Sequence, residues 1–414
     1  MLRRFALVAL ITTALVACGG RETEPGVESA AAWQWVECGG VECADFVVPR
    51  DRRAAFSDGL GLRAYRSESP AGSSRHLPLI IHPGGPGADV RAAVSRAREL
   101  LAPIIDDFDI YALSTRGSVD GEAFDCGSSL DDLRIVDTDA NAARRFADGC
   151  IARSGDLVGR VGTLDTVDDM EDFRRALGLQ QVRFLGWSYG ATVGAVWAVT
   201  HPSSIRRIVL DAPSDPRMKR FEAARRQMDA ASGAFLRTAS GSEVETSGFM
   251  SREIALARDY VLYDGGLEQV AESSTLTLAE LRLGETPDGN NDGGIETQIG
   301  VHCSDTSRSD SEDAIVLVEP TPAVGFGSVF DRVCRELPDP PRPLSKLAVD
   351  DRVTLVDALI VATSGDHVVP AEASTTLAAD MLWRRLVVDA PRHLSVGFDV
   401  RATKTAMAFL ATGD

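Results

Sequence analysis

The sequence is short of positive charge. Its 43 Lys and Arg residues stand against 61 Asp and Glu residues, which gives a formal net charge of −18 at pH 7. It also contains no run rich in Lys or Arg. Nucleic acids and anionic membrane surfaces bind proteins through clustered Lys and Arg side chains. The composition therefore excludes nucleic acid as the expected partner.

Metal-binding patterns and internal repeats are missing as well. The sequence has no C-x2-C pair with an accompanying histidine pair, so we expect no zinc site. We predict that the protein needs no metal and no other cofactor. A chain of 414 residues with 44% hydrophobic content can bury one large core or two smaller ones.

The first apolar segment is too short to span a bilayer comfortably. Arg3 and Arg4 precede an apolar stretch over residues 5–17, followed by Cys18 and Gly19. This arrangement resembles a bacterial lipoprotein signal, in which the cysteine is lipidated and becomes the first residue of the mature protein. We expect residues 1–17 to be the signal and residues 18–35 a tether. An ordinary secretory peptide with a coincidental cysteine is the alternative.

Seven cysteines occur in the sequence, and six are left if Cys18 carries lipid. An exported protein lies in an oxidising compartment, where disulfides are the default. Sequence alone leaves their pairing open. Pairing of neighbours is the most economical arrangement, and it joins Cys38 to Cys43, Cys126 to Cys150, and Cys303 to Cys334.

Short apolar runs alternate with helical patterns along much of the chain, which predicts a mostly parallel sheet covered on both faces. An antiparallel pair joined through Asp58 and Gly59 is expected at the sheet edge. A helix is expected over 163–177, with Gly178 as its stop. The expected strands are residues 43–49, 61–66, 76–81, 108–113, a strand from 182, and then 206–212, 357–363 and 385–389.

The alternation of expected strands and helices stops after Pro213. Helical patterning follows at 217–238 and 251–262, then a turn-rich patch at 286–294 and a Pro-rich stretch at 338–343. We interpret residues 213–346 as a mainly helical cap, inserted between two parts of one core, 36–212 and 347–414.

The most informative motif is Gly186-Trp187-Ser188-Tyr189-Gly190. It follows a buried strand and precedes the helix-compatible run 191–200. A strand, G-x-S-x-G and a helix form the nucleophile elbow of the α/β-hydrolase fold. No other serine in the chain has glycine at both of these positions. We therefore predict an α/β-hydrolase fold with Ser188 as the nucleophile.

A serine nucleophile needs a histidine to remove its proton and an acid to orient that histidine. In this fold the chain order is Ser, acid, His, each on a loop after a strand. His393 follows the last expected strand, and Asp366 follows the strand before it. Asp211, at the end of an earlier strand, is the alternative acid, because some hydrolases place the acid there. His367 is interpreted as a loop residue.

The oxyanion of an acyl intermediate needs backbone N–H donors. One expected donor is the amide of Tyr189, directly after the nucleophile. The other is expected in the loop 84–87, Gly-Gly-Pro-Gly, after the strand 76–81, and we assign it to Gly85.

Together, these motifs resemble the secreted tripeptidyl aminopeptidases and prolyl iminopeptidases, serine exopeptidases of the α/β-hydrolase superfamily. The matching segments are the loop 82–87, the segment 114–117, the elbow, the helix before it, the acid loop ending at Pro370, and Cys303-Ser304-Asp305. The resemblance implies an exported aminopeptidase that acts on peptides through an acyl-enzyme. It is weak through the expected cap.

Some positions depart from that family. Ser114 stands where the family has Asp, Ala88-Asp89 replaces Gly-Ser after the oxyanion loop, and the cap is short for a tripeptidyl enzyme. An aminopeptidase also needs carboxylates for the substrate ammonium. The cap offers Asp305, Glu312, Asp313 and Glu319, of which a solvated acidic face is the alternative interpretation. An esterase on the same fold and a non-catalytic binding protein are the competing functions.

Overall fold

The computed structural model describes residues 33–70, 76–102, 104–127, 132–133, 136, 139, 141–218, 294–311, 326–366, 368–390 and 392–413. The described residues from Gln34 onward belong to one compact unit. Across the described residues, no helix has both the length and the apolar character needed to cross a membrane.

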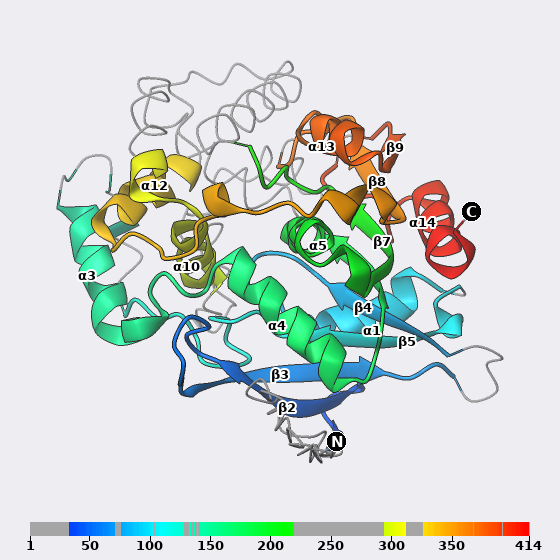
Figure 1. The fold of residues 1–414 in the computed structure, drawn as a ribbon, viewed down its shortest axis with the longest axis horizontal. Coiled ribbons are helices and arrows are strands. Elements are labelled where there is room, and N and C mark those ends of the chain that lie inside the picture. Colours follow the sequence, from blue (N-terminus) through cyan, green and yellow to red (C-terminus); the bar gives the residue numbers. More distant parts are fainter. Residues whose placement is uncertain are drawn as a thin grey trace, which may run out of the picture. The chain divides into compact units, whose positions relative to one another are not determined.

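One sheet organises this unit (Figure 1). In the described part of the chain it has nine strands, in the order β1-β2-β3-β5-β4-β6-β7-β8-β9. Strands β1, β2, β3 and β5 pair antiparallel, and every pairing from β5 through β4 to β9 is parallel. The strands are β1 (Val36–Glu37), β2 (Glu42–Pro49), β3 (Gly59–Ser67), β4 (Leu77–His82), β5 (Phe108–Leu113), β6 (Val182–Trp187), β7 (Ile205–Asp211), β8 (Ala358–Thr363) and β9 (Arg384–Val388).

Helices cover both faces of the sheet. Helices α4 and α5 pack together on one face, and α1 and α14 lie on the other. The described α-helices are α1 (Val90–Leu100), α3 (Ala142–Ser154), α4 (Thr163–Ala176), α5 (Tyr189–Thr200), α10 (Gly294–Asp305), α12 (Phe326–Glu336), α13 (Ala373–Met381) and α14 (Val400–Thr412). The predicted α/β-hydrolase architecture is confirmed.

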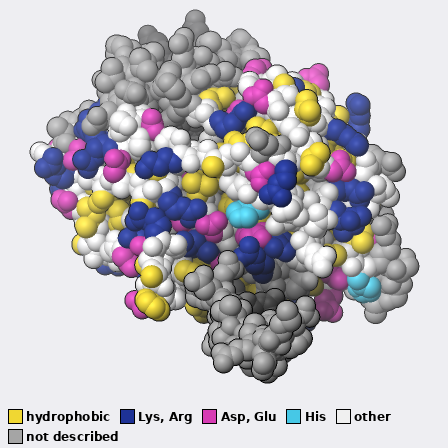
Figure 2. Space-filling view, viewed as in Figure 1, with side chains coloured by type: hydrophobic (Ala, Val, Ile, Leu, Met, Phe, Trp, Pro, Cys, Tyr) yellow, Lys and Arg dark blue, Asp and Glu magenta, His cyan; other side chains and the backbone are white. Residues whose placement is uncertain are grey.

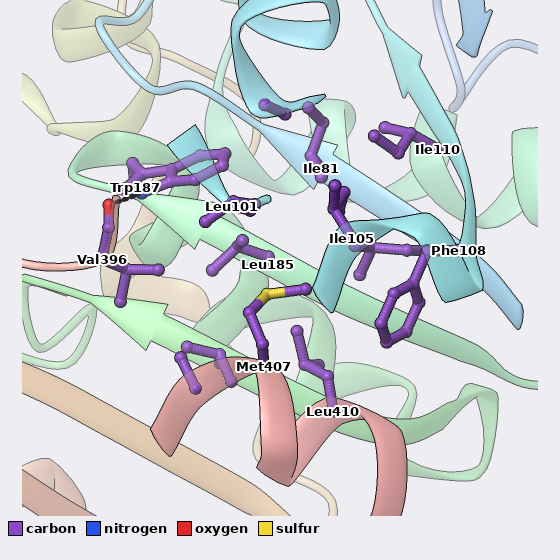
Figure 3. Close-up of a cluster of buried hydrophobic side chains, with 14 of the residues drawn as sticks. Ile81, Leu101, Ile105, Phe108, Ile110, Leu185, Trp187, Val396, Met407 and Leu410 are labelled. Atoms are coloured by element: carbon purple, nitrogen blue, oxygen red, sulfur yellow. Dashed lines mark hydrogen bonds between the residues drawn. The ribbon is translucent and has the colours of Figure 1, made fainter. Parts of the chain in front are cut away.

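Apolar side chains between the sheet and helices α1 and α14 form a continuous core, part of which Figure 3 shows. Leu185 of β6 and Met407 of α14 are both fully buried in it. The indole Nε1 of Trp187 donates a hydrogen bond of 2.9 Å to the carbonyl of Val396. This bond attaches the end of β6 to the chain that follows His393, so packing of the core also fixes the two segments that carry the site.

The opposite face has its own aromatic contact. Phe184 of β6 and Trp197 of α5 meet edge to face, with ring centroids 5.7 Å apart. Every residue of β6 is buried, because the strand lies in the middle of the sheet with helices on both sides. This explains why its sequence does not alternate between apolar and polar residues. The one charged residue of the strand, Arg183, is buried, and its Nε donates to the carbonyl of Leu410.

All the strands expected from the sequence are present, with ends that differ from the prediction by at most two residues. The largest consequence is at β4, which begins at Leu77 and ends on His82 instead of Ile81. His82 is therefore the last residue of the strand and not part of the loop. Helix α4 ends as predicted, with Leu177 as its C-cap and Gly178 following. Strand β1 and helices α1, α3, α13 and α14 were not predicted.

The expected cap is described only in part. The helical patterns at 217–238 and 251–262 and the patch 286–294 lie outside the described residues, apart from residues 217, 218 and 294. Helices α10 and α12 lie within the range 213–346 and pack against each other. The boundaries of the cap therefore stay a prediction.

Basic and acidic side chains are interspersed on the face that Figure 2 shows. Many of the basic side chains are paired locally, as in Arg145 with Asp132 and Arg153 with Asp125, each at 2.6 Å. Exposed pairs of this kind contribute little to stability individually. On this face, basic side chains are thus often paired with nearby acidic ones, in keeping with the absence of a basic run in the sequence.

Candidate active site

Ser188 lies at the turn between β6 and α5. Its backbone has φ 52° and ψ −122°, an unusual conformation for a residue with a side chain. A Cβ atom at Gly186 would collide with the carbonyl of Gly190, and one at Gly190 would collide with the carbonyl of His82. The two glycines of the motif are therefore required by close backbone approach.

The structure brings the predicted nucleophile, base and acid together. His393 Nε2 lies 2.9 Å from Ser188 Oγ, and His393 Nδ1 lies 2.8 Å from Asp366 Oδ2. All three side chains are buried. With the proton on Nδ1, the imidazole donates to the carboxylate and accepts from the serine hydroxyl. This is the geometry in which a histidine can take the serine proton.

Asp366 is held from its other oxygen. The N–H groups of Val368 and Val369 both donate to Asp366 Oδ1, each at 2.9 Å. Burial raises the pKa of Asp366, and the contact with His393 and these two backbone bonds oppose the rise. The loop after β8 therefore fixes the orientation of the carboxylate toward the imidazole.

Asp211, the alternative acid, has a different set of partners. Its Oδ2 accepts hydrogen bonds from the N–H groups of Ser395, at 2.9 Å, and Val396, at 2.7 Å. The residue is fully buried, and burial raises its pKa to about 7. Asp211 thus attaches β7 to the segment directly after His393, while Asp366 pairs with the imidazole itself.

Replacing Asp211 by Asn tests this arrangement, because the amide keeps an acceptor for both N–H groups and cannot titrate. A folded pKa of about 7, above the ordinary 3.8, contributes stability that is fully present below about pH 4 and is lost as the pH rises through 7. We therefore expect the free energy of unfolding of D211N, relative to the unchanged protein, to increase between pH 5 and pH 8. Urea denaturation at each pH measures it, and a difference independent of pH would contradict the raised pKa.

His82 lies at the site, although the sequence predicted it only as part of the loop 82–87, without a role of its own. Its Nδ1 accepts a hydrogen bond of 3.2 Å from the N–H of Gly84, and its Nε2 lies 3.1 Å from Thr115 Oγ1. Burial lowers the pKa of His82 to about 4, so the imidazole is neutral at neutral pH. Its position at the end of a strand beside a glycine-rich loop is the signal that could have identified it.

The glycine-rich loop lies beside the nucleophile. A Cβ atom built on Gly84 would be 3.2 Å from both Ser188 Cβ and the backbone N of Tyr189. Since the Gly84 N–H already donates to His82, the next N–H along the loop, that of Gly85, is the one we assign to an oxyanion. The loop therefore lies close to the backbone of Ser188 and Tyr189, and the pair of donors, Gly85 and Tyr189, stays a prediction.

The other described histidines have partners away from Ser188. His76 lies beside Ser69 and Asp109, His201 is the C-cap of α5, and His302 lies 2.8 Å from Asp331 in the α10–α12 pair. His367 lies outside the described residues.

Arg116, in the segment 114–117, has a structural position. Its guanidinium binds both oxygens of Asp169, each at 2.6 Å, and the carbonyl of Arg160 at 2.8 Å. The side chain is fully buried. The pair ties the loop after β5 to helix α4, which precedes the elbow.

Three disulfides join neighbouring cysteines, which is the pairing that the sequence made most economical: Cys38–Cys43, Cys126–Cys150 and Cys303–Cys334. Cys18 lies outside the described residues. In the part of the chain that the structure describes, no group of His, Cys, Asp or Glu side chains is arranged to hold a metal ion.

Two known proteins are similar to this chain in sequence. Serine protease Hip1 of Mycobacterium tuberculosis is 28% identical over 264 residues, which cover 57% of this chain and 50% of the relative. The tripeptidyl aminopeptidase of Streptomyces lividans is 29% identical over 229 residues, covering 51% of this chain and 42% of the relative. This chain therefore matches about half the length of these relatives or less.

A solved structure supports the fold. The acetylester hydrolase from Corynebacterium glutamicum has a TM-score of 0.50 at 12% identity, covering 90% of this chain and 97% of that one. The sequence model for the alpha/beta hydrolase fold matches residues 78–398, which include Ser188, Asp366 and His393. The chain belongs to the α/β-hydrolase fold family.

Proposed function

We propose that the protein is a serine hydrolase that removes short peptides or single residues from peptide N-termini. The observation that carries the proposal is the hydrogen-bonded line from Ser188 through His393 to Asp366 at the nucleophile elbow. The similarity to a serine protease and a tripeptidyl aminopeptidase favours a peptide substrate.

In the proposed reaction, His393 Nε2 removes the proton from Ser188 Oγ as that oxygen attacks the substrate carbonyl. The negative charge that develops on the carbonyl oxygen is stabilised by the N–H groups of Gly85 and Tyr189. His393 then gives the proton to the departing amine, which leaves an acyl-enzyme on Ser188. Water, deprotonated by His393, releases the acyl group and restores the serine hydroxyl.

Asp366 accepts a hydrogen bond from Nδ1 of His393, which keeps the proton on that nitrogen. It also stabilises the imidazolium that forms in each step. No step needs a metal or an organic cofactor, because a hydroxyl, an imidazole, a carboxylate and two backbone N–H groups supply all the chemistry.

Substrates with a free and a blocked N-terminus test the peptidase assignment. We expect turnover of peptidyl chromogenic substrates with a free α-amine, and a loss of about tenfold or more in kcat/KM when the amine is acetylated, because an aminopeptidase binds the ammonium. Short acyl esters form the third arm. Turnover of esters alone, with no peptide turnover in either form, would assign an esterase instead.

We further propose that the protein is exported and held at a membrane by lipid on Cys18. The support is the lipoprotein-like sequence before it, and an export route agrees with the three disulfides. Cys18→Ser should move the protein from the membrane fraction to the soluble fraction in a bacterial host. Unchanged membrane association of that variant would exclude the anchor.

A further inference from the structure

A chain of three side chains connects helix α10 to the residue after the nucleophile. Asp305, the last residue of α10, accepts hydrogen bonds from both the backbone N–H and the hydroxyl of Thr163. Thr163 Oγ1 in turn lies 3.1 Å from the hydroxyl of Tyr189. When Asp305 is ionised, the Thr163 hydroxyl gives its proton to the carboxylate and accepts from Tyr189. The chain thus has a defined direction, from Tyr189 through Thr163 to the carboxylate.

Thr163 is the first residue of α4, and that helix has no side-chain cap of its own. Its N-cap is Gly162, and the carboxylate of Asp305 takes the place of a capping side chain. A Cβ atom at Gly162 would lie 2.9 Å from Asp305 Oδ1, so the glycine leaves room for the carboxylate. The start of α4 is therefore built to receive Asp305 across 142 residues of sequence.

Tyr189 is held at both ends of its side chain. The hydroxyl is bound by Thr163, and the ring meets the imidazole of His82 edge to face, with centroids 5.8 Å apart. His82 also accepts the N–H of Gly84. The side chain of Tyr189 thus spans from the start of α4 to the glycine-rich loop, and its own N–H is one of the two proposed oxyanion donors.

The α10 end of the chain is anchored as well. Cys303, two residues before Asp305, forms a disulfide with Cys334 of α12. Burial raises the pKa of Asp305 to about 7, and the two hydrogen bonds from Thr163 oppose that rise. Losing the Thr163 hydroxyl would therefore also favour the protonated acid, a weaker acceptor for the N–H at the start of α4.

We propose that Asp305 is a positioning residue, which through Thr163 and the Tyr189 hydroxyl fixes the direction of the Tyr189 N–H in the oxyanion hole. The proposal rests on the serine hydrolase function above. Its physical basis is that a donor stabilises the developing charge only when it is held in place before the reaction. The ground-state substrate makes a weaker bond there, so the effect falls on kcat rather than KM.

Thr163→Val and Thr163→Ser test the relay, since Val has nearly the shape of Thr without the hydroxyl and Ser keeps the hydroxyl. With an acyl ester and a free-amine peptide as substrates, we expect T163V to lower kcat about tenfold with KM changed less than about twofold, and T163S to restore most of kcat. Asp305→Asn should lower kcat in the same way, because the amide offers one acceptor oxygen to two donors.

Glu171→Gln is the matched control. Glu171 is a buried carboxylate near the opposite end of α4, where it accepts from Trp197 Nε1 of α5 at 3.1 Å and from Ser204 at 3.1 Å. It joins the same two helices away from Tyr189. E171Q should lower the melting temperature and leave kcat within about twofold of the unchanged protein.

The double variant T163V/Y189F separates a relay from two independent effects. If Thr163 acts through the Tyr189 hydroxyl, the double variant loses no more in kcat than the larger single loss. Additive losses, an unchanged kcat in T163V, or a kcat loss in E171Q equal to that in T163V would each overturn the proposal. A rise in KM for the free-amine peptide alone in D305N would make Asp305 a substrate-binding group and overturn it too. An unchanged protein that turns over neither substrate would instead refute the serine hydrolase function.

Discussion

Ser188→Ala should lower kcat/KM for every acyl substrate by about 10⁴-fold or more. The variant loses the oxygen that His393 Nε2 contacts at 2.9 Å, and with it the acyl-enzyme. The backbone donors and the substrate contacts are still present, so a residual rate above that of the uncatalysed reaction is expected. Initial rates on chromogenic peptides and esters, with purified protein, measure the loss.

Two readouts make this result specific. Labelling by a fluorophosphonate should disappear in S188A, because the reagent reacts with an activated serine. Ser203→Ala is the matched control, since Ser203 is an exposed serine just beyond the far end of α5. S203A should keep its rate and its labelling. Turnover by S188A at a rate near that of S203A would remove Ser188 from the reaction and refute the proposed function.

Asp169→Ala should destabilise the folded protein by about 3–5 kcal/mol. The side chains of Arg116 and Asp169 are 0% and 2% exposed, and Asp169 is also an ion-pair partner of Arg52. Removing the carboxylate leaves the Arg116 charge buried without its bidentate partner. An uncompensated buried charge costs more free energy than loss of an exposed pair, because water cannot replace the missing contact.

The comparison that checks this is Asp132→Ala, which breaks the exposed pair with Arg145. Those side chains are 46% exposed for Arg145 and 21% for Asp132, so a much smaller loss of stability than in D169A is expected. Urea denaturation of both variants, with intact disulfides, gives the two free energies. A loss in D169A no larger than that in D132A would show that Arg116 finds another partner or water, contrary to its burial here.

Some elements form because of residues close to one another in the sequence, and these could be predicted from the sequence. The run that forms β6 is apolar except for Arg183 because the strand is buried on both sides. Gly186 and Gly190 are needed because other backbone atoms approach them too closely for a side chain. Helix α4 showed its apolar spacing and its stop at Gly178. These features depend on residues within a few positions of one another, so they can be recognised in one sequence.

Helix α14 shows the other case. Asp399 caps its start by accepting from the N–H of Ala402, and Gly413 is its C-cap, but several of its residues are Thr and Ala, with no strong apolar spacing. What holds it is burial of Met407 and Leu410 against the sheet. Its stability comes from packing, which a propensity argument does not include.

The sequence by itself determined the fold class, the nucleophile candidate and the order of the residues that could assist it. Only the tertiary structure decided which acid faces His393. Asp211 and Asp366 lie at or just after the ends of the adjacent parallel strands β7 and β8, so the sequence favoured Asp366 and kept Asp211 as the alternative. The two aspartates differ in which part of the segment after β9 packs against each of them. This segment places the His393 imidazole 2.8 Å from Asp366 and the backbone of Ser395 and Val396 on Asp211.

The same holds for the contact between Asp305 and Thr163, which no spacing in the sequence encodes. A motif in the sequence reflects requirements among residues that are close together in the chain. Hydrogen bonds between distant segments depend on strand register and helix packing, and these are set by the whole core at once.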